Sequence, residues 1–206
     1  MARIQTDRIV GYLTQVRVML DRMPVSAIEV VIDALLDAHA RGSRVFILGN
    51  GGSAATASHF ACDLGKGTIL PGQPRFRVLA LTDNVPLLTA WANDADYQDA
   101  FVEQLANLVQ SQDVVIGISA SGNSPNVLKA LEYARQVGAV AIGFTGFAGG
   151  KLKQLADVCI VVPSDHMGQI EDGHLILEHL ICTTIRERLA AENTPRRHGD
   201  TEGRHL

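Results

Sequence analysis

The sequence predicts an α/β protein built on a doubly wound, five-stranded parallel sheet, with helices before the sheet and a long helix after it. Five short runs are almost entirely apolar, which is typical of strands that are covered on both faces. The segments between these runs are long enough for the crossover helices that parallel strands require. The predicted strands are 44–48, 77–81, 113–119, 139–144 and 157–162.

Helices are expected before the sheet, because apolar residues recur twice at helical spacing within 1–43. The first set is Ile9, Leu13, Val16 and Leu20, and the second is Ile28, Val31, Ile32, Leu35 and Leu36. Gly42 is expected to end the second helix. We therefore predict a helical extension over 1–43.

The sheet domain is predicted over 44–192. Its crossover helices are expected near 53–65, 85–111, 125–137 and 149–155, and its long final helix near 167–190. The last segment, 193–206, is polar and contains Gly and Pro, so we predict a mobile tail there.

Composition limits the classes of function. Of the 206 residues, 47% are apolar and 19% are charged, which provides for one full core. A net charge of −4, no dense basic block and an aromatic content of 5% disfavour nucleic acid as a partner. No apolar run could span a membrane and no secretion signal is recognisable, so we expect a cytoplasmic protein without a membrane partner. Three scattered cysteines indicate neither a disulfide framework nor a zinc knuckle.

A glycine-rich turn follows the first predicted strand and opens a helix, where backbone N–H groups suit an anion. A nucleotide cofactor is disfavoured, because the nearest acid for a ribose, Asp83, comes too far beyond Gly49 and the lysine of a P-loop is missing. A tight turn without a ligand is the alternative. The candidate ligands are Asn50, Gly51, Gly52 and Ser53.

The third predicted strand runs into a serine-rich loop. Pro125 suits the first helical position and Ser124 the N-cap, but capping needs only one hydroxyl. Several hydroxyls and backbone N–H groups at a helix start suit a phosphate monoester. An esterase nucleophile is a poor alternative, because the loop lacks the final glycine of Gly-x-Ser-x-Gly. The candidate phosphate ligands are Ser119, Ala120, Ser121 and Ser124.

Ionisable side chains are predicted on two helices. His59 and Asp63 are four residues apart and project from one helix face. On the apolar final helix, ionisable groups are costly unless they are paired, ligated or catalytic. Each histidine taken singly fits an ordinary core or surface position, but a carboxylate and an imidazole near a phosphate loop favour proton transfer. The groups on the final helix are Glu171, His174, Glu178 and His179.

In their order, these segments resemble the sugar isomerase (SIS) domain family, and within it the sedoheptulose 7-phosphate isomerases. The resemblance covers about residues 5–190. It implies a phosphate held by the serine-rich loop, a homotetramer, and conversion of the ketose phosphate to D-glycero-D-manno-heptose 7-phosphate. It makes Asn93 and Asp94 candidates for substrate binding, although spacing alone favours a polar turn there. The segments that carry it are 49–55, 59–61, 93–94, 119–124 and 145–150.

The same resemblance implies roles for individual residues. Asp63 stands where the family has its catalytic glutamate base, and His179 where it has the acid. Zinc, which some members bind, would map to His59, Asp63, Glu171 and His179, with Glu171 in the place of a glutamine. The family's sugar-contacting arginine is missing, with Gly67 near its position. Because two adjacent carboxylates do not both ionise cheaply, either one is protonated or a cation lies between them, and we take this as support for a divalent metal.

Two functions compete at this point. We favour an aldose–ketose isomerase in which Asp63 is the base and His179 the acid. The alternative is a non-catalytic SIS module that senses a sugar phosphate or binds a protein partner, as DnaA-binding regulators with this fold do. The presence of His59 and His179 favours the enzyme, whereas the replacements at Asp63 and Glu171 favour the module.

The final helix also predicts self-association. Its apolar residues occupy more than one face, and a single sheet cannot cover them all, so we expect contacts between subunits. The resemblance extends this expectation to a homotetramer. The residues are Ile170, Leu175, Ile176, Leu177, Leu180 and Ile181.

Overall fold

Five parallel strands form one sheet in the order β2-β1-β3-β4-β5. A computed structural model describes residues 2–192, and the predicted tail 193–206 lies outside them. Each strand begins and ends within one residue of its predicted bounds, so the predicted fold class is confirmed. The strands are β1 (Arg44–Gly49), β2 (Arg77–Ala80), β3 (Val114–Ile118), β4 (Val140–Thr145) and β5 (Val158–Val161).

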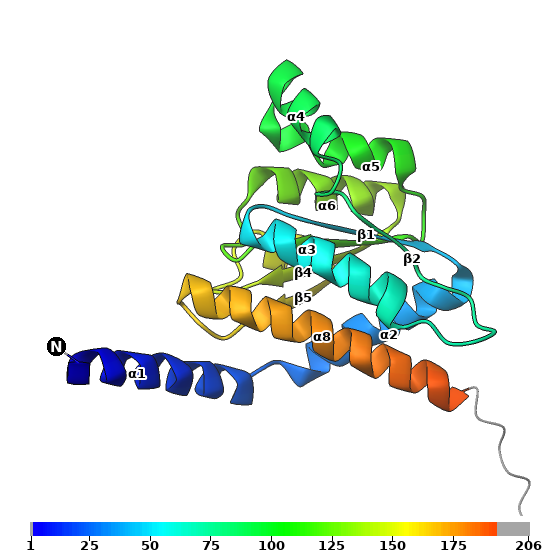
Figure 1. Ribbon diagram of the computed structural model, residues 1–206. Coiled ribbons are helices and arrows are strands. Elements are labelled where there is room, and N and C mark those ends of the chain that lie inside the picture. The colour runs from blue at the N-terminus through cyan, green and yellow to red at the C-terminus, as the bar shows by residue number, and fades with distance from the viewer. Residues whose placement is uncertain (1, 193–206) are drawn as a thin grey trace, which may run out of the picture.

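Helices cover both faces of the sheet, as a doubly wound fold requires (Figure 1). One face carries α2 (Val25–Arg41), α3 (Gly52–Cys62) and α8 (Met167–Glu192). The other carries α5 (Val102–Leu108), α6 (Pro125–Val137) and α7 (Leu152–Leu155). The other helical segments are α1 (Ala2–Asp21), α4 (Val85–Asp94), the π-helical turn η1 (Asp63–Gly67) and the 3₁₀ turn η2 (Tyr97–Asp99).

Each face of the sheet has its own apolar core. Under α2, α3 and α8, the ring of Phe60 stacks on that of Phe144 with centroids 6.1 Å apart. Under α5 and α6, Phe101, Leu105 and Leu131 are fully or almost fully buried. The central strands β1, β3 and β4 are therefore covered on both sides, as their apolar runs predict.

The strand β2 differs from this expectation. It lies at the sheet edge and is buried only in part along its length, with Leu79 48% exposed. Its apolar residues were expected to be covered on both faces, but in the described chain α4 has no buried residue and does not cover them. Figure 1 shows α4 standing above the body of the protein.

The single helix predicted over 85–111 is divided into α4, η2 and α5. The side chain of Asp96 accepts a hydrogen bond from the backbone N–H of Gln98 (2.9 Å), which offers the chain an alternative to helical hydrogen bonding. Asp96 itself is extended, with φ −144°. This local turn interrupts the helix between α4 and α5.

The two segments before the sheet pack differently. The α2 helix supplies core residues such as Val31 and Leu35, and it ends at Gly42 in the left-handed conformation, as predicted. In contrast, α1 extends away from the sheet (Figure 1). It is joined to α8 by a hydrogen bond from Tyr12 Oη to Asp172 Oδ2. The division at residue 43 stays a prediction. Across residues 2–192, no helix is both long and apolar enough to cross a bilayer.

Candidate active site

The strand order places a switch point between β1 and β3, where successive connections leave the sheet in opposite directions. Ligands in such sheets bind outside the carboxyl ends of the strands at this point. The glycine-rich turn follows β1 and the serine-rich loop follows β3, so both predicted anion loops lie at the switch point.

The serine-rich loop is a compact turn held by its own side chains. The hydroxyls of Ser119 and Ser124 are 2.9 Å apart, and Ser121 Oγ accepts from the backbone N–H of Asn123 (3.2 Å). Pro125 begins α6 with Ser124 at the N-cap, as predicted. The Ser124 hydroxyl makes no capping hydrogen bond, because it pairs with Ser119 instead. Both hydroxyls therefore point into the loop and not along the helix.

The glycine-rich turn is tied to the start of α6 by a side-chain network. Asn50 Nδ2 donates to Asn126 Oδ1 (2.9 Å), and Asn126 Nδ2 and Tyr97 Oη both donate to Asn50 Oδ1 (2.8 Å each). These three residues, with Ser124, line a cavity of about 300 Å³. Asn126 and Tyr97 were not among the predicted site residues, since a polar residue inside α6 and one in η2 carry no recognisable motif. Nearby, Gly51 adopts φ +55° and Ser53 is buried.

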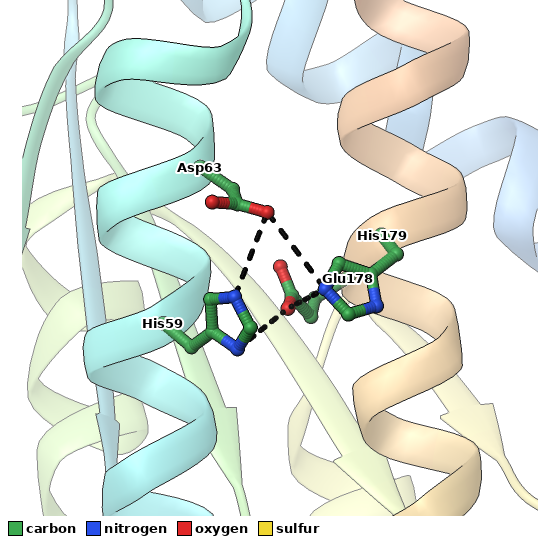
Figure 2. A group of neighbouring side chains, drawn as sticks. All are labelled: His59, Asp63, Glu178 and His179. Atoms are coloured by element: carbon green, nitrogen blue, oxygen red, sulfur yellow. Dashed lines mark ion pairs between the residues drawn. The ribbon is translucent and has the colours of Figure 1, made fainter.

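A second group of side chains converges between α3 and α8, as Figure 2 shows. Donor atoms of His59, Asp63, Glu178 and His179 all lie within 4.8 Å of one another. The separations from His59 are 3.7 Å between Nε2 and Asp63 Oδ2, and 3.3 Å between Nδ1 and Glu178 Oε1. Those from His179 Nε2 are 3.8 Å to Asp63 Oδ2 and 3.2 Å to Glu178 Oε1. We call these four residues the His–carboxylate cluster.

Glu178 is the unusual member of this cluster. Its side chain is 0% exposed, whereas His59 and His179 are nearly half exposed. Neither carboxylate oxygen of Glu178 has a hydrogen-bond partner in the described part of the chain. The pKa of Glu178 is raised above its ordinary value, chiefly by burial and further by the Asp63 carboxylate, and the imidazoles of His179 and His59 offset this rise only in part. Its Oε1 faces only the two imidazoles, at ion-pair distance, so a buried carboxylate without hydrogen bonds calls for positive charge at this position.

The structure brings together His59, Asp63 and His179 as predicted, but places Glu171 elsewhere. A β-carbon added to Gly52 would come within 2.8 Å of Glu171 Oε1, so this carboxylate lies at the start of α3. Glu171 and Glu178 are two turns apart on one face of α8, about 10 Å along its axis. Because α3 and α8 lie side by side, Glu171 meets the first turn of α3 and Glu178 meets its end.

A cavity of about 350 Å³ opens beside the cluster. Asp63 and His179 line one part of it, and Arg186 and Thr183 line another. Arg186 Nη1 donates to the carbonyl oxygen of Gly67 (2.7 Å), so a guanidinium from α8 lies beside the position at which the family arginine is missing.

Two further residues from the sequence analysis lie apart from the cluster. Asn93 and Asp94 are exposed at the end of α4, where Asn93 Nδ2 donates to Asp94 Oδ1 (2.8 Å).

The histidine one turn before Glu178 lies in the core instead. The buried ring of His174 donates from Nε2 to the carbonyl oxygen of Thr145 (3.2 Å), and burial lowers its pKa to about 4. His174 is therefore a neutral core residue.

The fold and these loops match known proteins. The family model of the SIS domain matches residues 11–146, which defines the class of this protein. A phosphoheptose isomerase of Aneurinibacillus thermoaerophilus is 38% identical over 174 residues, covering 84% of this chain and 86% of that protein. One of Mycobacterium tuberculosis is 39% identical over 175 residues, covering 85% and 89%. The chain therefore belongs to the phosphoheptose isomerase family of SIS-domain proteins.

A solved structure agrees with this assignment. The phosphoheptose isomerase of Neisseria gonorrhoeae superposes with a TM-score of 0.82 at 28% identity, covering 89% of this chain and 99% of that one.

Proposed function

We propose that this protein is an aldose–ketose isomerase that converts sedoheptulose 7-phosphate to D-glycero-D-manno-heptose 7-phosphate. The observation that carries the proposal is the convergence of the Asp63 carboxylate and the His179 imidazole on one cavity. Relatives of nearly the same length that are named as phosphoheptose isomerases support it.

The phosphate is held at the switch point of the sheet. Hydroxyls and backbone N–H groups of the two loops surround it, without a lysine, and their binding energy orients the sugar toward the catalytic pair. The cavity lined by Asn50 and Ser124 offers room for a ligand at the switch point. The residues assigned to the substrate are Asn50, Gly51, Gly52, Ser53, Asn93, Asp94, Ser119, Ala120, Ser121 and Ser124.

The reaction moves one proton between two neighbouring carbons. Asp63 removes a proton from C1 of the ketose while His179 donates one to the carbonyl oxygen at C2, which gives an enediol. Return of the carbon-bound proton to C2, with loss of the proton on the C1 oxygen, gives the aldose. General acid–base catalysis of this kind contributes about 10²–10⁴ to the rate. No nucleotide cofactor is required, because no hydride leaves the substrate.

A divalent metal, zinc in our proposal, fits the His–carboxylate cluster. Two imidazoles and two carboxylates are the donor types that zinc accepts, and the buried Glu178 carboxylate, which makes no hydrogen bond, supports a cation at this position. His59, Asp63 and His179 would hold the ion. When bound, zinc would supply Lewis-acid polarisation of the C2 carbonyl oxygen in place of a proton from His179, because an imidazole nitrogen that coordinates a metal carries no proton.

We further propose a cytoplasmic homotetramer. Apolar side chains on α1 and α8 support self-association, since Leu13, Leu175 and Leu180 are exposed in the protomer.

Exchange of label from solvent tests the isomerase proposal. The protein is incubated with a panel of ketose phosphates in deuterated water, and we expect deuterium at C1 of recovered sedoheptulose 7-phosphate and at C2 of the aldose. Absence of label with every sugar, together with binding of a sugar phosphate, would favour the non-catalytic sensing or partner-binding module instead. The variant Asp63→Asn serves as the matched control for exchange without the base.

A further inference from the structure

We propose that Glu178, and not Glu171, is the fourth donor of the divalent-cation site formed with His59, Asp63 and His179; this deepens the proposed function, since it rests on a metal at the His–carboxylate cluster. The resemblance to the family gives Glu178 no role. Its assignment comes from distances, burial and charge within this chain.

The separations between donor atoms of the His–carboxylate cluster match the spacing of ligands around a metal better than the lengths of hydrogen bonds. Charge-assisted N–H···O bonds are about 2.7–2.9 Å long. Around zinc, with ligands at about 2.0–2.2 Å in a tetrahedron, neighbouring donor atoms lie about 3.3–3.6 Å apart. The two Glu178 separations are 3.2 and 3.3 Å, and the two Asp63 separations are 3.7 and 3.8 Å. All four are too long for charge-assisted hydrogen bonds and close to the edges of a tetrahedron.

His59 requires one adjustment. It presents Nδ1 to Glu178 but Nε2 to Asp63, and a metal ligand uses only one ring nitrogen. The side chain is 45% exposed, and a rotation about its broad χ2 torsion would place one nitrogen between the two carboxylates. His179 needs no such change, since its Nε2 faces both.

Burial makes Glu178 dependent on a cation. A carboxylate removed from water without hydrogen bonds is strongly destabilising unless it is neutralised or paired. Two carboxylates with two neutral imidazoles and one divalent ion give a cluster of zero net charge. The same ion would bind the Glu178 oxygens, which make no hydrogen bond within the described residues.

Glu171 cannot take this place without leaving its own. It lies about 10 Å from Glu178 along α8, and its carboxylate occupies the space that a β-carbon on Gly52 would need, at the first turn of α3. His59 lies seven residues after Gly52, which is also about 10 Å along α3. The cluster and Glu171 are thus at different levels of the same helix pair.

Zinc affinity of the full chain tests the proposal. The protein is stripped with a chelator, and zinc alone is then titrated in competition with a chromogenic chelator, with metal content per subunit measured in parallel. We expect Glu178→Gln to weaken zinc binding at least about 10-fold, and Glu171→Gln to stay within about 2-fold of the wild type. Glu132→Gln, an exposed glutamate on α6, is the control. Loss of zinc in Glu171→Gln but not in Glu178→Gln would overturn the proposal.

Thermal unfolding separates a ligand from a structural residue. Zinc should raise the Tm of the wild type and of Glu171→Gln, but not that of Glu178→Gln. In the stripped protein, Glu178→Gln should unfold at or above the wild-type Tm, because a buried charge has been removed. A lower Tm, or failure to fold, would assign Glu178 a structural role and contradict the proposal. If the wild type binds no zinc, this inference fails, while label exchange from deuterated water still decides the isomerase activity.

Discussion

Gly122 lies so close to Gly149 that a β-carbon added to Gly122 would come within 2.1 Å of the Gly149 carbonyl oxygen. The serine-rich loop after β3 is therefore wedged against the loop after β4, and the backbone N–H of Leu152 also donates to the Gly122 carbonyl oxygen (2.9 Å). Such a loop is already shaped before a phosphate arrives, which limits the entropy that binding must remove.

We expect Gly122→Ala to destabilise the protein strongly. Gly122 has φ +65°, which an L residue adopts at a cost of about 1 kcal/mol, and the contact with Gly149 adds a clash with backbone. Gly42 is a matched control, because it has φ +68° but no atom within 4 Å of an added β-carbon. Urea unfolding should show a larger loss in the free energy of unfolding for Gly122→Ala than for Gly42→Ala. Equal losses would mean that the backbone at Gly149 moves aside and relieves the clash.

The base assignment predicts a selective loss of turnover in Asp63→Asn. The amide keeps the shape of the side chain but cannot accept a proton, so kcat should fall at least about 10²-fold while the substrate still binds. Steady-state kinetics and isothermal titration with the substrate measure the two effects. An unchanged kcat would remove Asp63 from the role of base.

The serine-rich loop predicts the opposite pattern. Ser121→Ala removes an exposed hydroxyl at the proposed phosphate site, so KM should rise about 10- to 100-fold, the effect of losing one hydrogen bond to a charged group. Ser111 is the control, because it is an exposed serine before β3, at the end of the strand opposite the serine-rich loop. Ser111→Ala should leave both kcat and KM unchanged. If kcat falls and KM does not change, Ser121 does not act through phosphate binding.

His174 predicts a loss of stability at low pH. Its folded pKa of about 4 lies below the ordinary 6.5, so the unfolded chain binds the additional proton and stability is lost as pH falls through this window. Once His174 is fully protonated in both states, the free energy of unfolding is lower by about 3 kcal/mol. We compare the wild type with His174→Gln by urea unfolding at pH 7 and pH 4.5, so that all other groups are shared. The variant should lose less stability between the two pH values, and identical losses would contradict the assignment.

The sequence predicts the family and every strand because both depend on local patterns: apolar runs such as 44–48 and ordered loop motifs. The comparisons confirm the family and the class of isomerase. The sequence does not predict that Glu178 lies beside His59, because this contact depends on how far α8 is shifted along α3. Residues on the same helix face, such as Glu171 and Glu178, cannot be told apart by periodicity alone. The break at Asp96 was missed because one Asx turn is a weak signal within an apolar crossover.

The exposed apolar side of α1 predicts that the protein self-associates. Ile9, Val10 and Leu13 are each more than half exposed on a helix that extends away from the sheet and reaches α8 of its own protomer (Figure 1). Burial of such surface contributes about 25 cal/mol per Å², and monomers rarely leave large apolar patches in water. Closed symmetry then favours a dimer or a dimer of dimers, of which the family resemblance favours the second.

Analytical ultracentrifugation at micromolar concentration should give a mass of about four times 22.1 kDa for the wild type. Leu13→Glu should give smaller species, whereas the control Glu132→Lys on α6 should keep the wild-type mass. A persistent 22.1 kDa species with full activity would refute both the assembly and any need for it in catalysis.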